Sequence, residues 1–221
     1  KIKANLKSWV CSLPSTPAKP VVYDFPKPKP REAFVIPSMV QYTGKGYSFR
    51  KLGFEYKGSM EVLKTILSLD YLWNKVRVQG GAYGCFLMQS PNGQFILCSY
   101  RDPNLQKTLN AYDGTVQYLK DMDISDFEMT KYIIGTIRNF DQPKTASGKS
   151  AAEDRYYFKN TTQKDVQKQR DEILATDVPA LKSYLEMVER VMKEDCYCVF
   201  GSSNKINEEK ELFTEIITVL K

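Results

Sequence analysis

Arg77 and Tyr83 are the two side chains in this sequence whose types and spacing could together act on a peptide. An arginine offers a planar fork of N–H donors, and a tyrosine offers one hydroxyl donor on a stiff ring. Projecting on the same side of a domain, they could hold the backbone carbonyls of an extended peptide, or the oxyanion that forms when a carbonyl is attacked. Two plainer interpretations stay open: an arginine is favoured at a helix C-terminus, and an aromatic residue suits a strand end.

The segment around this pair predicts a helix, a sharp stop and a strand. The apolar run through Leu72 predicts a helix that continues into Arg77 and ends at Gly80 and Gly81. Paired glycines suit that stop, because the residue after a helix often needs a positive φ, which glycine adopts without a Cβ penalty. A strand is expected to follow over 82–89, which places Tyr83 at its start.

A second strand and a second helix are expected to complete this unit, which extends to Leu105. Pro91-Asn92-Gly93 is typical of a turn, and residues 95–100 then return as a strand. Asp102 is expected to cap a helix over 103–119, with Pro103 at its first position.

The rest of the chain predicts an α+β domain with a mainly antiparallel sheet of about four to five strands, backed by several helices. Ser59, Ser125 and Asp177 are expected to cap helices. The other expected elements are the end of a helix at 1–13, strands at 33–43, 54–56 and 196–201, a loop or bulge at 44–46, and helices at 59–77, 125–140, 147–159, 162–175, 177–193 and 207–220.

Histidine is absent from the 221 residues, which excludes every histidine-based triad and every zinc site that needs imidazole. With 42% hydrophobic and 26% charged residues, the composition is that of an ordinary globular domain. No run of about 18 apolar residues occurs, so no helix is expected to span a membrane. Because the chain begins with Lys1 rather than Met, we expect it to be a piece of a longer protein.

The first quarter of the chain carries its positive charge. Residues 1–57 hold 11 Lys and Arg against 3 Asp and Glu, a net charge of +8, and the remaining residues have a net charge of −2. Seven prolines between Pro14 and Pro37 predict an extended linker, stiffest over 25–31. A surface spacer is the favoured interpretation, and an SH3-type ligand or a nucleic-acid contact stays open.

Three other motifs are incomplete. Ser147-Gly-Lys-Ser150 mimics the end of a phosphate-binding loop, but the first glycine of such a loop would fall at Pro143. Gly44-Lys-Gly46 lacks the third glycine of a dinucleotide loop. The pair Cys196 and Cys198 predicts a core strand rather than a metal site. We interpret these two and the other three cysteines as buried thiols in a reducing compartment; the three are Cys11, Cys85 and Cys98.

Two sequence blocks, Arg77-Val-Gln-Gly-Gly-Ala-Tyr-Gly84 and Ser99-Tyr-Arg-Asp-Pro-Asn104, resemble the C-terminal domain of the presequence-protease branch of the insulinase-like (M16) zinc metallopeptidases. The resemblance covers 33–119 well, and the later helical part agrees in order and length. It implies the domain fold of M16 peptidases and LuxS-like metallohydrolases. Residues 33–221 would form the substrate-binding domain, and residues 1–32 a Pro/Lys-rich linker or the end of a preceding domain.

The resemblance also implies a mechanism. The family chain has four domains around a closed chamber, and the first carries an inverted zinc motif, His-x-x-Glu-His. Without histidine, this chain would be the last domain, which binds no metal, so zinc would be held by another domain of the parent enzyme. The zinc would polarise the scissile carbonyl and activate water. Arg77 and Tyr83, with Gly80 and Gly81 beside them, would bind the substrate or its oxyanion from the opposite wall.

These implications predict a non-catalytic C-terminal domain of a zinc-dependent endopeptidase that degrades unstructured peptides, inactive on its own. The expected partners are peptide substrates and the other domains of its own chain, with neither nucleic acid nor membrane. The isolated domain is expected to pair with itself in a crystal. We expect a bacterial cytoplasmic protein, or an organellar one if the chain is eukaryotic. The alternatives are a catalytically inactive M16-like assembly or binding module, and a nucleic-acid binder acting through residues 1–57.

Overall fold

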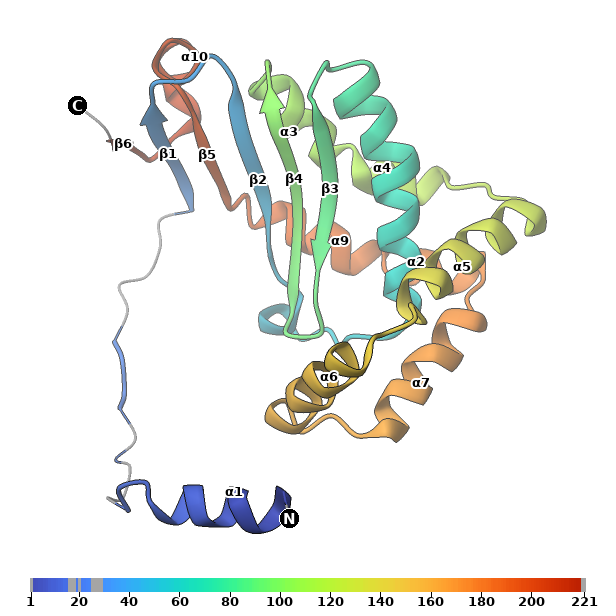
Figure 1. Ribbon diagram of the computed structural model, residues 1–221. Coiled ribbons are helices and arrows are strands. Elements are labelled where there is room, and N and C mark those ends of the chain that lie inside the picture. Colours follow the sequence, from blue (N-terminus) through green and yellow to red (C-terminus); the bar gives the residue numbers. More distant parts are fainter. Residues whose placement is uncertain (1, 16–18, 20, 25–29, 220–221) are drawn as a thin grey trace.

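A mixed sheet of six strands lies at the centre of this computed structural model, which describes residues 2–15, 19, 21–24 and 30–219 (Figure 1). Its strands are β1 (Arg31–Ile36), β2 (Gln41–Ser48), β3 (Gly84–Gln89), β4 (Gln94–Asp102), β5 (Tyr197–Ser202) and β6 (Glu215–Thr218). They lie in the order β3-β4-β2-β5-β1-β6. Strands β2, β3, β4 and β5 pair antiparallel, whereas β1 runs parallel to both β5 and β6. The α+β fold class is confirmed, with one strand more than expected.

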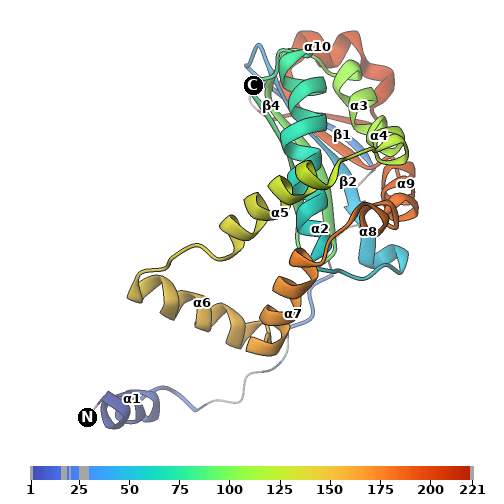
Figure 2. The same cartoon turned by 90° about the vertical axis from the view of Figure 1, so that its right-hand side faces the viewer.

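Helices cover mainly one face of this sheet (Figures 1 and 2). The helices are α1 (Ile2–Cys11), η1 (Phe49–Leu52), α2 (Ser59–Ile66), η2 (Leu67–Val78), α3 (Gln106–Asp113), α4 (Thr115–Asp121), α5 (Asp126–Phe140), α6 (Ala146–Phe158), α7 (Gln163–Leu174), α8 (Val178–Lys182), α9 (Leu185–Lys193), α10 (Ser203–Glu208) and η3 (Lys210–Leu212). Helix η2 continues α2 as a π-helix, and helix α6 stands away from the sheet. Among the described helices, none combines the length and hydrophobicity needed to cross a bilayer.

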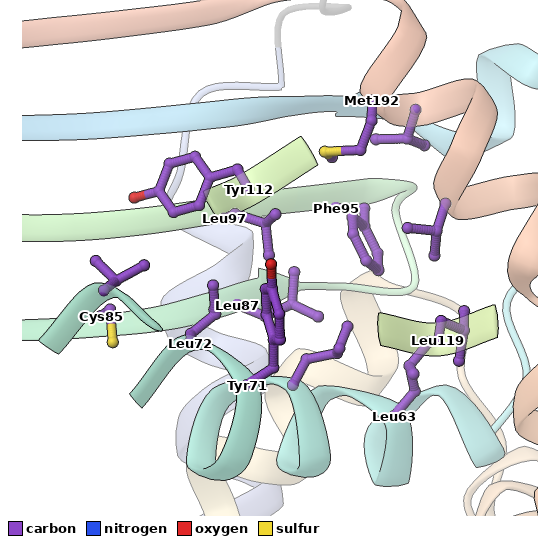
Figure 3. Close-up of a cluster of buried hydrophobic side chains, with 14 of the residues drawn as sticks. Leu63, Tyr71, Leu72, Cys85, Leu87, Phe95, Leu97, Tyr112, Leu119 and Met192 are labelled. Atoms are coloured by element: carbon purple, nitrogen blue, oxygen red, sulfur yellow. The ribbon is translucent and has the colours of Figure 1, made fainter. Parts of the chain in front are cut away.

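The hydrophobic core lies between the sheet and these helices (Figure 3). Leu87, Phe95 and Leu97 of the β3–β4 hairpin point toward Leu63 and Leu72 of the α2–η2 helix, and all five are at most 1% exposed. Burying a side chain of this size contributes about 1.5–3 kcal/mol to folding. The packing therefore fixes the hairpin against the helix, and with it the turn that joins them.

Side chains on successive strand residues point to opposite faces of the sheet. Phe86 and Met88 alternate with the buried residues of β3 and are 40% and 45% exposed. Tyr42 of β2 and Phe200 of β5 are exposed to a similar extent. The face of the sheet that points away from the core is therefore apolar.

The first strand expected over 33–43 is two strands, because the chain turns after Ile36 at Pro37, where proline removes a donor from the ladder. The expected loop at 44–46 was also wrong, because these residues lie inside β2. A Cβ on Gly46 would lie 2.0 Å from the carbonyl oxygen of Phe95, so glycine allows the two strands to approach. Lys45 is 3% exposed, and its amine pairs with Asp113 and Asp195.

The last helix expected at 207–220 was wrong. Helix α10 ends at Glu208, and the chain returns as β6 beside β1. The run Ile216-Ile-Thr-Val219 is β-branched throughout, which restricts its side chains in a helix and suits a strand. Its partner β1 lies nearly two hundred residues earlier, so local signals do not reveal this pairing.

Helix-capping predictions were partly confirmed. Ser125 forms a capping box with Glu128, and the side chain of Asp177 accepts a bond from the Ala180 amide. The helix expected at 177–193 divides into α8 and α9. Ser59 does not cap its helix, because Gly58 holds the cap position and the Ser59 hydroxyl bonds to Tyr184 instead.

Three further expectations concern single segments. Residues 54–56 form no strand but pack irregularly against the core. All five thiols are free, yet only Cys85 is buried; Cys98 and Cys196 are half-buried, and Cys11 and Cys198 are exposed. The stiffest part of the linker falls mostly on residues 25–29, which lie outside the described part of the chain.

Candidate functional site

Helix η2 ends just after Arg77, through a turn that needs glycine at two positions. A Cβ on Gly80 would lie 2.3 Å from the carbonyl oxygen of Val76, and Gly81 has a φ of +81°. Only glycine avoids both the collision and the left-handed strain. The Gly81 amide donates to the Arg77 carbonyl at 2.8 Å, closing the helix. Arg77 therefore precedes this turn at the end of η2, as the sequence predicts, and Tyr83 follows it, one residue before β3 rather than at the start of the strand.

Side chains from the segment after β4 bind the end of η2. Asn104 Nδ2 donates to the carbonyl of Gly80 at 2.5 Å, and Lys107 Nζ donates to the carbonyl of Gln79 at 3.1 Å. Both carbonyls belong to the C-terminal end of a helix, where backbone acceptors lack partners within the helix. The two sequence blocks, 77–84 and 99–104, thus form a single structural unit, which we call the corner.

Asp102 holds the second block in place. The carboxylate is fully buried and accepts bonds from the Asn104 amide at 2.9 Å and from Thr108 Oγ1 at 2.7 Å. The expectation that Asp102 caps a helix starting at Pro103 was therefore wrong, because helix α3 begins only at Gln106. The Asp102 side chain instead accepts a bond from the backbone amide two residues later, which forms an Asx-turn, a common role of aspartate.

The Tyr83 ring lies between two residues from the end of β4. The Tyr100 ring meets it edge to face with centroids 5.6 Å apart, and the Arg101 guanidinium carbon lies 5.4 Å from its centroid. The Tyr83 amide also donates to the Arg101 carbonyl at 3.2 Å. The side chain is nevertheless 59% exposed, and no described residue bonds its hydroxyl. The Tyr83 ring is thus held by contacts with Tyr100 and Arg101, while its hydroxyl remains available to donate a hydrogen bond.

Gly84 makes room for this arrangement. A Cβ at this position would lie 2.2 Å from Cε1 of Tyr100, so any side chain would displace the Tyr100 ring. The register of the hairpin pairs Gly84 directly with Tyr100. Tyr100 can therefore lie across β3 and contact both Tyr83 and Phe86.

Arg77 is stacked as well. Its guanidinium carbon lies 3.9 Å from the centroid of the Trp73 ring, one helical turn earlier. Stacking occupies the flat face of the guanidinium and leaves its in-plane N–H donors available. No described residue forms an ion pair with Arg77, which is half-buried. Neither Arg77 nor Tyr83 lies in the hydrophobic core, and that they act together on one peptide stays a prediction.

A thiol lies directly beside the corner, at Cys85, but it is not a reactive one. Burial raises the pKa of the Cys85 thiol from an ordinary value near 9 to about 11, and the neighbouring Arg77 opposes this shift. At neutral pH the thiol is protonated and so a weak nucleophile. Among the described residues, no group of three or more His, Cys, Asp or Glu could hold a metal ion. The described residues therefore do not fit a zinc site.

Sequence reasoning gave no role to Tyr100, Arg101 or Gly84, although all three lie in the two blocks. The signal for Tyr100 was the turn at 91–93, because a hairpin centred there brings Gly84 and Tyr100 together. Arg101 had no such signal, since its placement depends on the local backbone of β4.

Comparison with known proteins now identifies the family. Residues 31–202 match the family model of the PreP C-terminal domain. The chain belongs to the family of presequence-protease C-terminal domains. The resemblance drawn from the two blocks is thereby confirmed.

Curated relatives of this presequence-protease domain include bacterial and organellar proteins. Protein HypA of Clostridium perfringens is 45% identical over 199 residues, which cover 90% of this chain and 20% of that protein. Presequence protease 1, chloroplastic/mitochondrial, of Arabidopsis thaliana is 34% identical over 220 residues, which cover 97% of this chain and 20% of that protein. The chain thus spans about a fifth of the length of these relatives.

Solved structures share the fold of this domain. The peptidase M16 inactive domain from Pseudomonas fluorescens aligns with a TM-score of 0.63 at 16% identity, over 91% of this chain and 50% of that one. A protease from Helicobacter pylori aligns with a TM-score of 0.65 at 17% identity, over 90% of this chain and 51% of that one. At such low identity these likenesses show the M16 domain fold alone.

Proposed function

We propose that this presequence-protease C-terminal domain binds the backbone of unstructured peptides within a larger zinc-dependent peptidase. Tyr83 and Arg77 are the proposed hydrogen-bond donors, and the turn of Gly80 and Gly81 lies beside the bound peptide. The observation that carries the proposal is the corner itself, where two ring-stacked donors lack any described partner. If the two side chains only stabilised the fold, we would expect their donors to form hydrogen bonds within the domain.

The chemistry of the two donors suits a peptide backbone. The hydroxyl of Tyr83 and the N–H groups of Arg77 can each donate to a carbonyl oxygen, and every peptide has carbonyl oxygens whatever its sequence. A donor aimed at the scissile carbonyl also stabilises the negative charge that develops when the carbonyl is attacked. Because both side chains are held by stacked rings, little ordering is needed when the peptide arrives.

Zinc belongs to another domain in this proposal, because the described residues of this chain do not fit it. The chain alone is then inactive, and its partners are peptide substrates and the other domains of its parent. The 45% identity with the Clostridium perfringens protein supports a bacterial parent, for which the cytoplasm is the proposed compartment; a eukaryotic parent would be organellar, like the Arabidopsis thaliana relative. A catalytically inactive M16-like assembly or binding module is the alternative. A His-x-x-Glu-His motif upstream in the parent would decide against it.

The test uses the full-length parent with Tyr83→Phe and with Arg77→Ala. Removing one oxyanion donor typically lowers kcat about a hundredfold or more, so we expect a loss of this order for Tyr83→Phe. Tyr157→Phe is the matched control, because Tyr157 is 83% exposed on α6, away from the corner. Unfolding midpoints should stay unchanged in all three variants. Full activity in both corner variants would overturn the proposed site.

A further inference from the structure

Arg101 has a backbone conformation that side-chain-bearing residues rarely adopt. Its φ is +47°, in the left-handed region. The register between β2 and β4 shifts at this point: Thr43 pairs with Ser99, but Gln41 pairs with Asp102. Strand β4 thus has one residue more than β2 here, which is a β-bulge. Bulges often lie beside functional sites, where they redirect a side chain.

The redirected side chain lies over the Tyr83 ring, with its guanidinium carbon 5.4 Å from the centroid. No described residue accepts a hydrogen bond from this guanidinium, so its N–H donors remain available for a ligand. No described residue forms an ion pair with Arg101. The adjacent carboxylate of Asp102 is buried and already accepts bonds from Asn104 and Thr108.

Other arginines in the described chain lack this combination. Arg31, Arg170 and Arg190 form ion pairs with acidic residues, and Arg50 donates to a backbone carbonyl. Arg138 on α5 and Arg155 on α6 are exposed and have no described ion-pair partner, but neither has a bulge or a stacked ring. Arg101 alone among these joins left-handed backbone, ring stacking and a free donor edge, directly beside the proposed peptide site.

We infer that Arg101 binds a carboxylate of the peptide while Tyr83 binds its backbone. The inference rests on the proposed function and adds a substrate preference to it. A guanidinium presents two parallel N–H donors that match the two oxygens of a carboxylate. An acidic side chain and a free C-terminus present the same group, so both are ligands of this site.

Three peptides of otherwise identical, neutral sequence separate these sources. The first has one Glu and an amidated C-terminus, the second has Gln there and a free C-terminus, and the third has Gln and an amide. Dissociation constants are measured by calorimetry for the full-length parent made catalytically inactive in its other domains, so that the peptides are not cleaved during the titration. The parent should bind one or both carboxylate peptides about tenfold more tightly than the third, as charge-assisted hydrogen bonds usually allow.

Arg101→Gln should bring the ratio of dissociation constants to about one, because glutamine keeps a polar side chain and loses the charge and the guanidinium fork. Arg101→Lys should restore part of the ratio, since lysine keeps the charge without the planar fork. Arg138→Ala, the charge-matched control, should leave the ratio unchanged. A ratio near one in the parent, or a ratio that survives Arg101→Gln, would overturn the inference. Tyr83→Phe should leave the ratio intact, so that failure of the backbone site and failure of the carboxylate site are read separately.

Discussion

Gly84→Ala should disturb the corner while leaving the fold intact. The added Cβ would lie 2.2 to 2.6 Å from the Tyr100 ring, so the ring must rotate away, and the backbone at this glycine does not need a positive φ. Tyr100 would then lose its contacts with Tyr83 and Phe86. Each aromatic pair contributes about 0.5–1.5 kcal/mol. Replacing glycine by alanine returns about 0.4–1 kcal/mol through the unfolded chain. The net loss of folding free energy should be about 1–2 kcal/mol.

A double-mutant cycle with Tyr100→Ala isolates this effect, measured by urea unfolding of the chain. In the original chain, Gly84→Ala should lower the free energy of unfolding by about 1–2 kcal/mol. In the Tyr100→Ala background, the same substitution should leave that free energy unchanged or raise it slightly. Gly44→Ala is the matched control in the same sheet, because its Cβ would meet Ile96 and Cys98 at ordinary contact distances of 3.7 and 3.9 Å. That variant should be neutral or stabilising. An equal cost of Gly84→Ala in both backgrounds would refute the reasoning.

Two further predictions concern the elements that support the corner. Gly80→Ala should cost about 1–3 kcal/mol in urea unfolding, because the carbonyl of Val76 that it would strike is backbone and cannot rotate away; a neutral result would contradict the tight turn. The second concerns pH. Burial raises the pKa of the Cys85 thiol from near 9 to about 11. The thiol therefore contributes fully to stability below pH 9, where it is neutral in both the folded and the unfolded state, and this contribution is lost as the pH rises through 11. Between those limits the chain should lose about 2 kcal/mol more stability than its Cys85→Ala variant, and parallel pH profiles would contradict this.

Local signals predicted the elements around the corner well. The glycine pair after Arg77, the turn at 91–93 and the capping box at Ser125 each depend on residues a few positions apart, and the structure has a helix end, a hairpin and a helix start there. Parallel pairing has no such signal. Strand β6 joins β1 across most of the chain, so its β-branched run was mistaken for a helix.

The same contrast between local and distant signals applies to the candidate site. The placement of Arg77 at a helix end and of Tyr83 beside the following strand was predicted, because local sequence signals mark the elements around them. Arg101 was not, because its position depends on the extra residue in β4 opposite Tyr42, and a bulge changes the register without a distinctive residue pattern. Lys45, in the segment expected to be a loop, also depends on residues distant in sequence. Lys45 is buried because two aspartates distant in sequence, Asp113 and Asp195, neutralise it.

The central claim is that the Tyr83 hydroxyl binds a peptide carbonyl. The most direct measurement is a crystal structure of the full-length parent, made catalytically inactive in its other domains and bound to an unstructured peptide. The account predicts a peptide carbonyl oxygen within about 2.5–3.0 Å of the Tyr83 hydroxyl oxygen, the usual hydrogen-bond range. A bound peptide that passes the chamber without approaching either Tyr83 or Arg77 would contradict it.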